Sequence, residues 1–165
     1  MKVSRGVLAA FILGTGVQSA AAEPVTLDAI LSTTKDISLA FKSEKRHFLT
    51  LLLREGKAQG EGVFEGAQVA EYGMHDVTGG IGGEASGYIE ATTTGGDTAY
   101  FRWHLKAAFV AGTDGKTRVV NGGTWELASG TGRFADHKGV GSLRIEFPSK
   151  TERRYILEGD ISPNP

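Results

Sequence analysis

The sequence GGTWELASGTGRFADHKGVG, from Gly122 to Gly141, decides the fold. Trp125 and Leu127 alternate with polar residues, as in a strand that buries one face. The glycines that follow permit tight backbone turns that other residues adopt only at a cost in free energy. These glycines are Gly130, Gly132, Gly139 and Gly141. The stretch therefore predicts two strands joined by a tight corner, and it indicates architecture and not catalysis.

The same alternation extends to both sides of this stretch. Its clearest run is Thr98–Phe109, where Arg102, His104 and Lys106 alternate with apolar residues, which indicates one solvated and one buried face. The buried face of this run is expected to consist of Ala99, Phe101, Trp103, Leu105, Ala107 and Phe109. Further strands are expected over residues 37–42, 47–54, about 58–77, 84–94, 117–128, 139–147 and 153–161.

Two local features are predicted before residue 80. Thr26 is expected to cap a short helical turn over residues 27–31, whose apolar side chains would share one face. Glu55–Lys57 is predicted to be a turn, and the strand after it, over about residues 58–77, is expected to bend at one of its glycines.

About eight strands at short spacing, with no crossover helix between them, favour antiparallel pairing throughout. The fold class predicted is all-β: a single closed antiparallel eight-stranded barrel with a short N-terminal helical turn. A β-sandwich is the alternative. An outer-membrane barrel would need aromatic girdles, which these strands lack.

Met1–Ala22 has the pattern of a secretory signal peptide. Lys2 and Arg5 give a basic start, Gly6–Val17 is apolar, and three alanines precede Glu23. We expect cleavage near Ala22 and a periplasmic or secreted mature protein. The apolar run, at about 12 residues, is shorter than the roughly 20 that cross a bilayer, so no membrane span is expected.

Residues 23–165 are predicted to form the single β-barrel domain. The formal net charge of the chain is −1, and removing the two positive charges of the leader leaves −3. No basic tract is present to neutralise phosphates, so nucleic acid binding is excluded. The chain has no cysteine, and therefore neither disulfides nor thiolate metal ligands.

Three motifs resemble one known family. Gly123-Thr124-Trp125, the GTGRFA sequence of Gly130–Ala135, and Gly139-x-Gly141 are similar to the pattern of the allene oxide cyclase-like barrel superfamily, which includes dirigent proteins. The resemblance covers roughly Gly79 to Ile161. It implies a closed eight-stranded barrel with an apolar cavity, and a homotrimer as in plant members. The matched residues are turn and packing residues, so neither the cyclase nor the dirigent activity is carried over.

Few residues indicate chemistry. The histidines lack the paired spacing of a zinc site, and no nucleophile motif or phosphate-binding loop is present, so no metal and no cofactor is expected. The histidines are His47, His75, His104 and His137, and the carboxylates considered as acids or bases are Glu71, Glu90 and Glu126. Alternation places Glu90 and Glu126 outside the barrel and leaves Glu71 undecided, with solvated carboxylates the favoured interpretation for all three.

The predicted cavity lining consists of Phe101, Trp103, Leu105, Trp125 and Tyr155. These side chains could equally be a filled core, because eight-stranded barrels occur in both forms. The favoured function is non-catalytic binding of a small hydrophobic molecule. An isomerase or cyclase for a lipid-like or phenolic substrate, and a structural or partner-binding envelope protein, are the alternatives. An open cavity with an inward carboxylate or histidine would favour catalysis, and an open, wholly apolar cavity would favour binding without catalysis. A filled interior would favour a structural or partner-binding protein.

Overall fold

The computed structural model describes residues 21–164, and in it eight antiparallel strands follow one another around a closed barrel. The strands are β1 (Glu23–Ala40), β2 (His47–Gln59), β3 (Gln68–Thr78), β4 (Gly82–Thr92), β5 (Thr98–Ala111), β6 (Thr117–Gly130), β7 (His137–Glu146) and β8 (Glu152–Pro163). Pairing of β1 with β8 closes the barrel, which confirms the predicted barrel over the sandwich. The predicted leader covers residues 1–22, of which 1–20 lie outside the described part.

The predicted N-terminal helical turn is wrong, because residues 23–40 form the longest strand. Val25, Leu27, Ala29 and Leu31 point inward and are buried, so the alternation has a period of two. Hydrogen bonding to β8, from Glu23 to Ser32, outweighs the helical spacing of the same apolar residues. The short 3₁₀ helix of the fold is instead Gly132–Phe134, inside the glycine-rich corner.

The turn predicted at Glu55–Lys57 is also wrong. These residues lie within β2, and Gly56 faces Leu31 of β1 so closely that a Cβ at this position would collide with the backbone of Ile30. The glycine is needed for close strand approach and not for a turn. The predicted strand over residues 58–77 is divided by a loop between Gln59 and Gln68.

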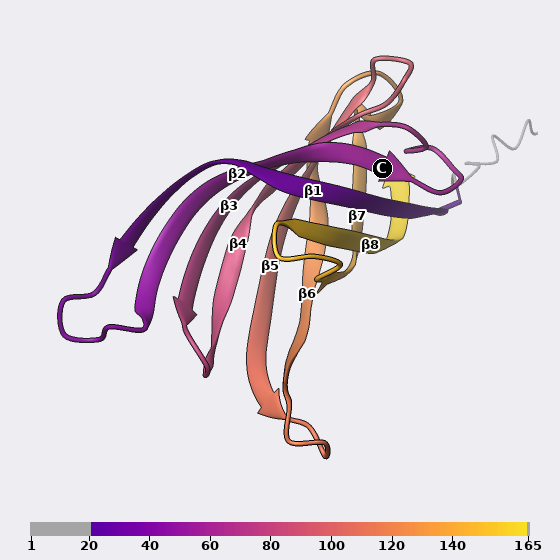
Figure 1. Ribbon diagram of the computed structural model, residues 1–165. Helices are drawn as coiled ribbons and strands as arrows, with labels where there is room; N and C mark the ends of the chain where they lie inside the picture. Colours follow the sequence, from indigo (N-terminus) through magenta and orange to yellow (C-terminus); the bar gives the residue numbers. More distant parts are fainter. Residues whose placement is uncertain (1–20, 165) are drawn as a thin grey trace, which may run out of the picture.

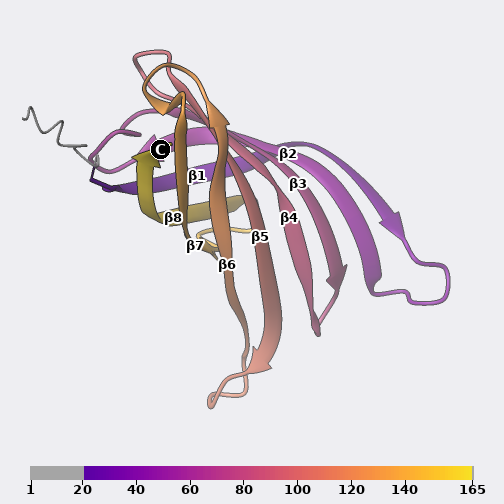
Figure 2. The same cartoon turned by 180° about the vertical axis from the view of Figure 1, so that it is seen from behind.

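The barrel widens toward one end. Pairing between β6 and β7 stops at Gly123 and Leu143, although β6 begins at Thr117, and pairing of β1 with β8 stops at Ser32. The amide of Asn121 bridges the start of the gap, donating to the carbonyl of Ile145 at 2.7 Å and accepting from its N–H at 2.8 Å. In Figures 1 and 2 the β1–β2 and β5–β6 hairpins project past the shorter β7–β8 hairpin, which leaves a flared mouth.

Aromatic side chains fill the opposite end. Phe64, from the β2–β3 loop, stacks on Phe134 with ring centroids 5.2 Å apart and meets Phe101 edge-on at 5.6 Å. All three are almost fully buried. The glycine-rich corner therefore contributes Phe134 as a plug, which accords with its predicted architectural role. No helix among the described residues is long and apolar enough to cross a membrane.

Trp125 occupies space that two glycines leave free. A Cβ at Gly141 or at Gly159 would lie 2.6 Å from the indole ring of Trp125. The buried indole N–H groups of Trp103 and Trp125 have no hydrogen-bond partner among the described residues. Apolar contact, and not hydrogen bonding, therefore holds these two rings in the core.

Replacing Gly141 with Ala should lower the free energy of unfolding by about 2 kcal/mol or more, because the methyl group would collide with the carbonyl oxygen of Glu158 and with the indole ring of Trp125. Gly122→Ala is the matched control in the same stretch, since a Cβ there would meet no atom within 4 Å. Urea unfolding of both variants tests this, and equal stability of the two would contradict the close packing of β8 and Trp125 around Gly141.

Candidate functional site

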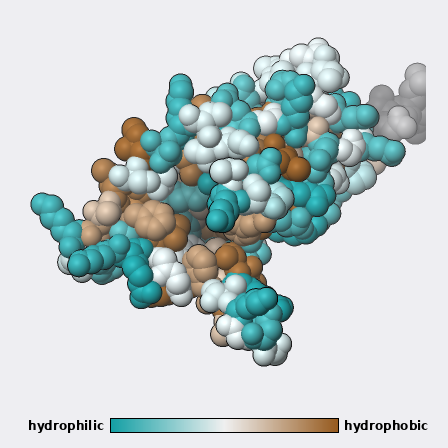
Figure 3. All heavy atoms as spheres, in the orientation of Figure 1, coloured by the Kyte–Doolittle hydropathy of each residue, from teal (hydrophilic) through white to brown (hydrophobic). Residues whose placement is uncertain are grey.

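A cavity of about 380 Å³ opens into the flared mouth. Its apolar wall comes from alternate, inward-facing residues of β5, β6 and β7, among them Leu105, Phe109, Val119 and Ile145. Polar side chains from β2, β3 and β8 line the other side, namely Arg54, His75, Arg153 and Tyr155. In Figure 3 apolar surface lies between the two projecting hairpins, where the molecule is hollowed. The interior is thus filled at one end and open at the other.

A buried polar network forms the floor of this cavity. Nη1 of Arg54 donates to Oε2 of Glu71 at 2.8 Å and to the hydroxyl oxygen of Tyr155 at 2.7 Å. The Tyr155 hydroxyl donates to the same Glu71 oxygen at 2.5 Å. Glu71 has no exposed surface, and the Arg54 side chain is only 10% exposed. A carboxylate so deeply buried is stable because the guanidinium of Arg54 neutralises its charge and hydrogen bonds replace its hydration.

His75 completes the network and borders the cavity. Its Nε2 lies 3.2 Å from Oε1 of Glu71, and the His75 side chain is 17% exposed. Glu71, Gly73 and His75 alternate on the inner face of β3, and a Cβ at Gly73 would lie 3.0 Å from Nε2 of His75 and closer still to Oε1 of Glu71. The absence of a side chain at Gly73 is therefore what allows the carboxylate and the imidazole to meet.

The network fixes its own protonation states. Burial alone would raise the pKa of Glu71, but the hydrogen bond from His75 and the charge of Arg54 outweigh burial and lower this pKa below the usual 4.5. Burial, and next the charge of Glu71, raise the pKa of Tyr155 well above 10.0. Glu71 is thus a carboxylate and Tyr155 a phenol at neutral pH. Because a carboxylate only accepts hydrogen bonds, Nε2 of His75 carries its proton.

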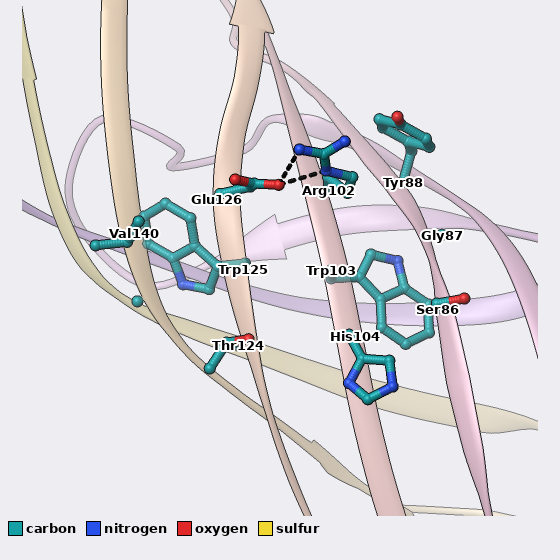
Figure 4. Close-up of a pocket in the computed structure, with 11 residues that line it drawn as sticks. Ser86, Gly87, Tyr88, Arg102, Trp103, His104, Thr124, Trp125, Glu126 and Val140 are labelled. Atoms are coloured by element: carbon teal, nitrogen blue, oxygen red, sulfur yellow. Dashed lines mark hydrogen bonds and ion pairs between the residues drawn. The ribbon is translucent and has the colours of Figure 1, made fainter.

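A second, shallower groove crosses the outer wall over β4 to β7 (Figure 4). Arg102 and Glu126 form an ion pair there, and their side chains are 59% and 46% exposed. These charges are solvated and satisfy each other, so they offer little to a ligand. The outward positions predicted for Arg102, His104 and Glu126 are confirmed, and so is that of Glu90, which receives a long hydrogen bond from Tyr72.

The five residues predicted to line the cavity all point inward and are buried. Leu105 and Tyr155 border the cavity. The other three lie deeper: the rings of Trp103 and Tyr155 meet edge-on at 6.3 Å, and those of Phe101 and Trp125 at 5.1 Å. The structure therefore divides the predicted set into a packed core and a cavity border. Contact of any of the five with a ligand stays a prediction.

The sequence did not indicate Arg54 or Arg153 as site residues, and it named Glu71 and His75 as candidates without placing either at the cavity. For Glu71 the solvated interpretation is wrong, because three donors replace its hydration. The alternation of Val69, Glu71, Gly73, His75 and Val77 on one face of β3 was the available signal. This alternation does not show which face of β3 is buried, because the opposite face also carries large apolar side chains. These are Tyr72 and Met74, which are about half exposed. The neighbour of His75, Asp76, points to the opposite face of β3 and binds His47 on the outside of the barrel.

Comparison with known proteins identifies no family for this chain. No family model matches the sequence, and no curated protein matches it. Among solved structures the chain is similar to a pterocarpan synthase dirigent protein, with a TM-score of 0.38 and 8% sequence identity over 98% of this chain and 100% of that one. Similarity at this level establishes neither common family membership nor common activity. The resemblance stated from the sequence motifs therefore stays a prediction.

The described part of the chain contains no cluster of side chains that could ligate a metal ion. No three His, Asp or Glu side chains between residues 21 and 164 lie together as a metal site would require. The groups that line the cavity include two arginines, an imidazole, a phenol and an apolar wall.

Glu71→Gln should lower the free energy of unfolding at neutral pH by about 3 kcal/mol, because Arg54 would then be a buried charge without a counter-charge. The pKa of Glu71 is lower in the folded than in the unfolded protein, so its stabilisation is complete above pH 4.5 and is lost as the pH falls below that value. Urea unfolding over a pH series should show a shallower acid loss for Glu71→Gln than for wild type. The outer-wall control Glu90→Gln should keep the wild-type slope, and a wild-type slope in Glu71→Gln would contradict the assignment.

Proposed function

We propose that the protein binds a small, largely apolar molecule in the cavity at the flared mouth of the barrel. The observation that carries this proposal is the open space of about 380 Å³ above an interior that is otherwise packed. Ligand pockets of roughly 300–1,000 Å³ that combine an apolar wall with a few fixed polar groups are typical small-molecule sites. A protein that needed the barrel only as a scaffold would gain stability by filling this space with side chains.

The wall of the cavity supports an apolar ligand more than a polar one. Leu105, Phe109, Val119 and Ile145 expose apolar surface to the space, and none of them has a hydrogen-bonding side chain. Burying a ligand's apolar area against them contributes about 25 cal/mol per Å². The polar groups are confined to the floor and to one side, where they would orient the ligand.

A neutral fluorescent probe, N-phenyl-1-naphthylamine, tests the cavity directly. We expect its emission to rise on binding to wild type, and Val119→Trp to weaken binding at least about tenfold because the indole fills the space. Val120→Trp is the matched control, since the adjacent side chain points outward and is 58% exposed. Far-UV circular dichroism checks that both variants fold. Equal binding by the two variants, or no binding by wild type, would contradict the proposal.

A second candidate function is proton transfer within the bound molecule. It is favoured by His75, an imidazole at the cavity whose Nε2–H is held by a buried carboxylate. Nδ1 of His75 has no hydrogen-bond partner within residues 21–164, so its lone pair is free to accept a proton. Removal of a proton from one carbon and its return to another would give an isomerase that needs no co-reactant. Glu71 itself cannot touch a ligand, because it has no exposed surface.

His75→Gln separates binding from catalysis. If the protein only binds, the variant should retain probe affinity within about threefold, and wild type should exchange no carbon-bound hydrogen of a bound β,γ-unsaturated ketone for deuterium. Exchange that wild type catalyses and His75→Gln loses by about a hundredfold or more would establish the second function. Proton nuclear magnetic resonance in deuterated water measures the exchange.

Two expectations from the sequence stay predictions. Export with cleavage near Ala22 would be tested by sequencing the N-terminus of the exported protein, where Glu23 is the expected first residue. The trimer implied by the family resemblance would be tested by sedimentation equilibrium of the same preparation.

A further inference from the structure

The cavity offers positive charge to a ligand and no free negative charge. We propose that the bound molecule is an organic carboxylate with a compact apolar body, and that its carboxylate binds Arg153 beside His75. This inference rests on the proposed binding function and names the class of ligand.

Arg153 is a cation held in place without a carboxylate partner. Its Nη1 donates to the carbonyl of Glu152 at 2.7 Å and to those of Ser149 and Lys150 at 3.3 Å. Its guanidinium also lies over the ring of Phe147, 4.9 Å from the centroid. Within the described residues no Asp or Glu oxygen lies within salt-bridge distance of Arg153. These contacts occupy one nitrogen and one face, which leaves further N–H donors for a ligand.

The adjacent Arg154 shows what a paired arginine looks like in this chain. Arg154 points to the outer wall and binds Asp28 through two hydrogen bonds of 2.8 and 2.6 Å, and Glu146 through one of 3.1 Å. Carboxylates thus satisfy Arg154 on the outside. On the inside, backbone carbonyls orient Arg153, but they do not neutralise its charge.

Each carboxylate near the cavity already forms an ion pair with a cation other than Arg153. Glu71 lies beneath the floor without exposed surface and is neutralised by Arg54. Glu84, at the edge of the lining, pairs with Lys106 at 2.8 Å. Burial, reinforced by the nearby charge of Arg54, lowers the pKa of Arg153, which means that its positive charge is destabilised where it lies. The attraction of a bound anion would stabilise this charge.

The shape of the site favours a carboxylate on a compact body. Arginine binds a carboxylate through two parallel N–H donors, a geometry that a single point charge does not match. Behind this group the ligand would meet Leu105, Phe109 and Val119, which are apolar. The volume of about 380 Å³ is near the lower end for ligand pockets, so an aromatic or branched acid fits the space better than a long chain does.

Two probes of equal shape test the inference. Displacement of N-phenyl-1-naphthylamine from the full mature protein is measured with 2-naphthoate and with 2-naphthamide, which differ in charge. We expect wild type to bind the carboxylate at least about tenfold more tightly than the amide, the factor that charge-assisted hydrogen bonds supply. Arg153→Gln should abolish this preference, because it weakens carboxylate binding far more than amide binding. Arg144→Gln, which removes the same charge from the exposed outer wall, should keep it.

The outcomes separate this inference from the proposed function. Equal affinity of wild type for naphthoate and naphthamide would overturn the carboxylate assignment, while displacement of the neutral probe would still support the cavity. A preference retained in Arg153→Gln would overturn the role of Arg153. Loss of the preference in both arginine variants would show a long-range effect of charge and would also overturn the role of Arg153. Failure of wild type to bind the neutral probe would contradict the proposed function itself.

Discussion

The ion pair between Arg54 and Glu71 divides the barrel interior into a packed half and an open half. Taking a carboxylate out of water costs several kcal/mol unless its oxygens are fully hydrogen-bonded, and here Arg54, Tyr155 and His75 supply the donors. These donors come from β2, β8 and β3, of which β8 is separated from β2 by β1. The network can therefore form only when the barrel is closed, which couples its stability to the correct arrangement of strands that are distant in sequence.

The network also explains why the aromatic core stops where it does. Below it, Trp103 and Phe101 continue toward the plug of Phe64 and Phe134, with glycines leaving room for the large rings. Above it, β6 separates from β7 beyond the bridge made by Asn121, so no opposing side chains reach across to fill the space. The result is a cavity with an apolar wall, a polar floor and one cation that backbone carbonyls hold in place.

The sequence predicts the strands and the barrel well, because strict alternation in residues 98–109 and the glycine-rich corner specify one buried face and tight turns. It fails at the N-terminus, where Leu27 and Leu31 fit both a helical and an extended spacing, and only pairing with β8 decides between them. It also fails at Glu71 and Arg54. A charged residue at an inward position looks like a solvated one until its partner is known, and these partners are 17 and 84 residues away in the chain. Of the residues that border the cavity, the sequence indicated Leu105 and Tyr155, but neither the rest of the apolar wall nor the two arginines.

The central claim is that a ligand enters the mouth of the barrel and lies against its inner wall. Methyl-resolved nuclear magnetic resonance of the protein, labelled at Ile, Leu and Val and titrated with 2-naphthoate, tests it most directly. A ligand in this cavity should change the chemical shifts of the methyl groups that line it, those of Val77, Leu105, Val119 and Ile145, and leave those of the outward-facing Val120 and Val140 unchanged. Changes at the outer wall with an unperturbed inner wall would contradict it.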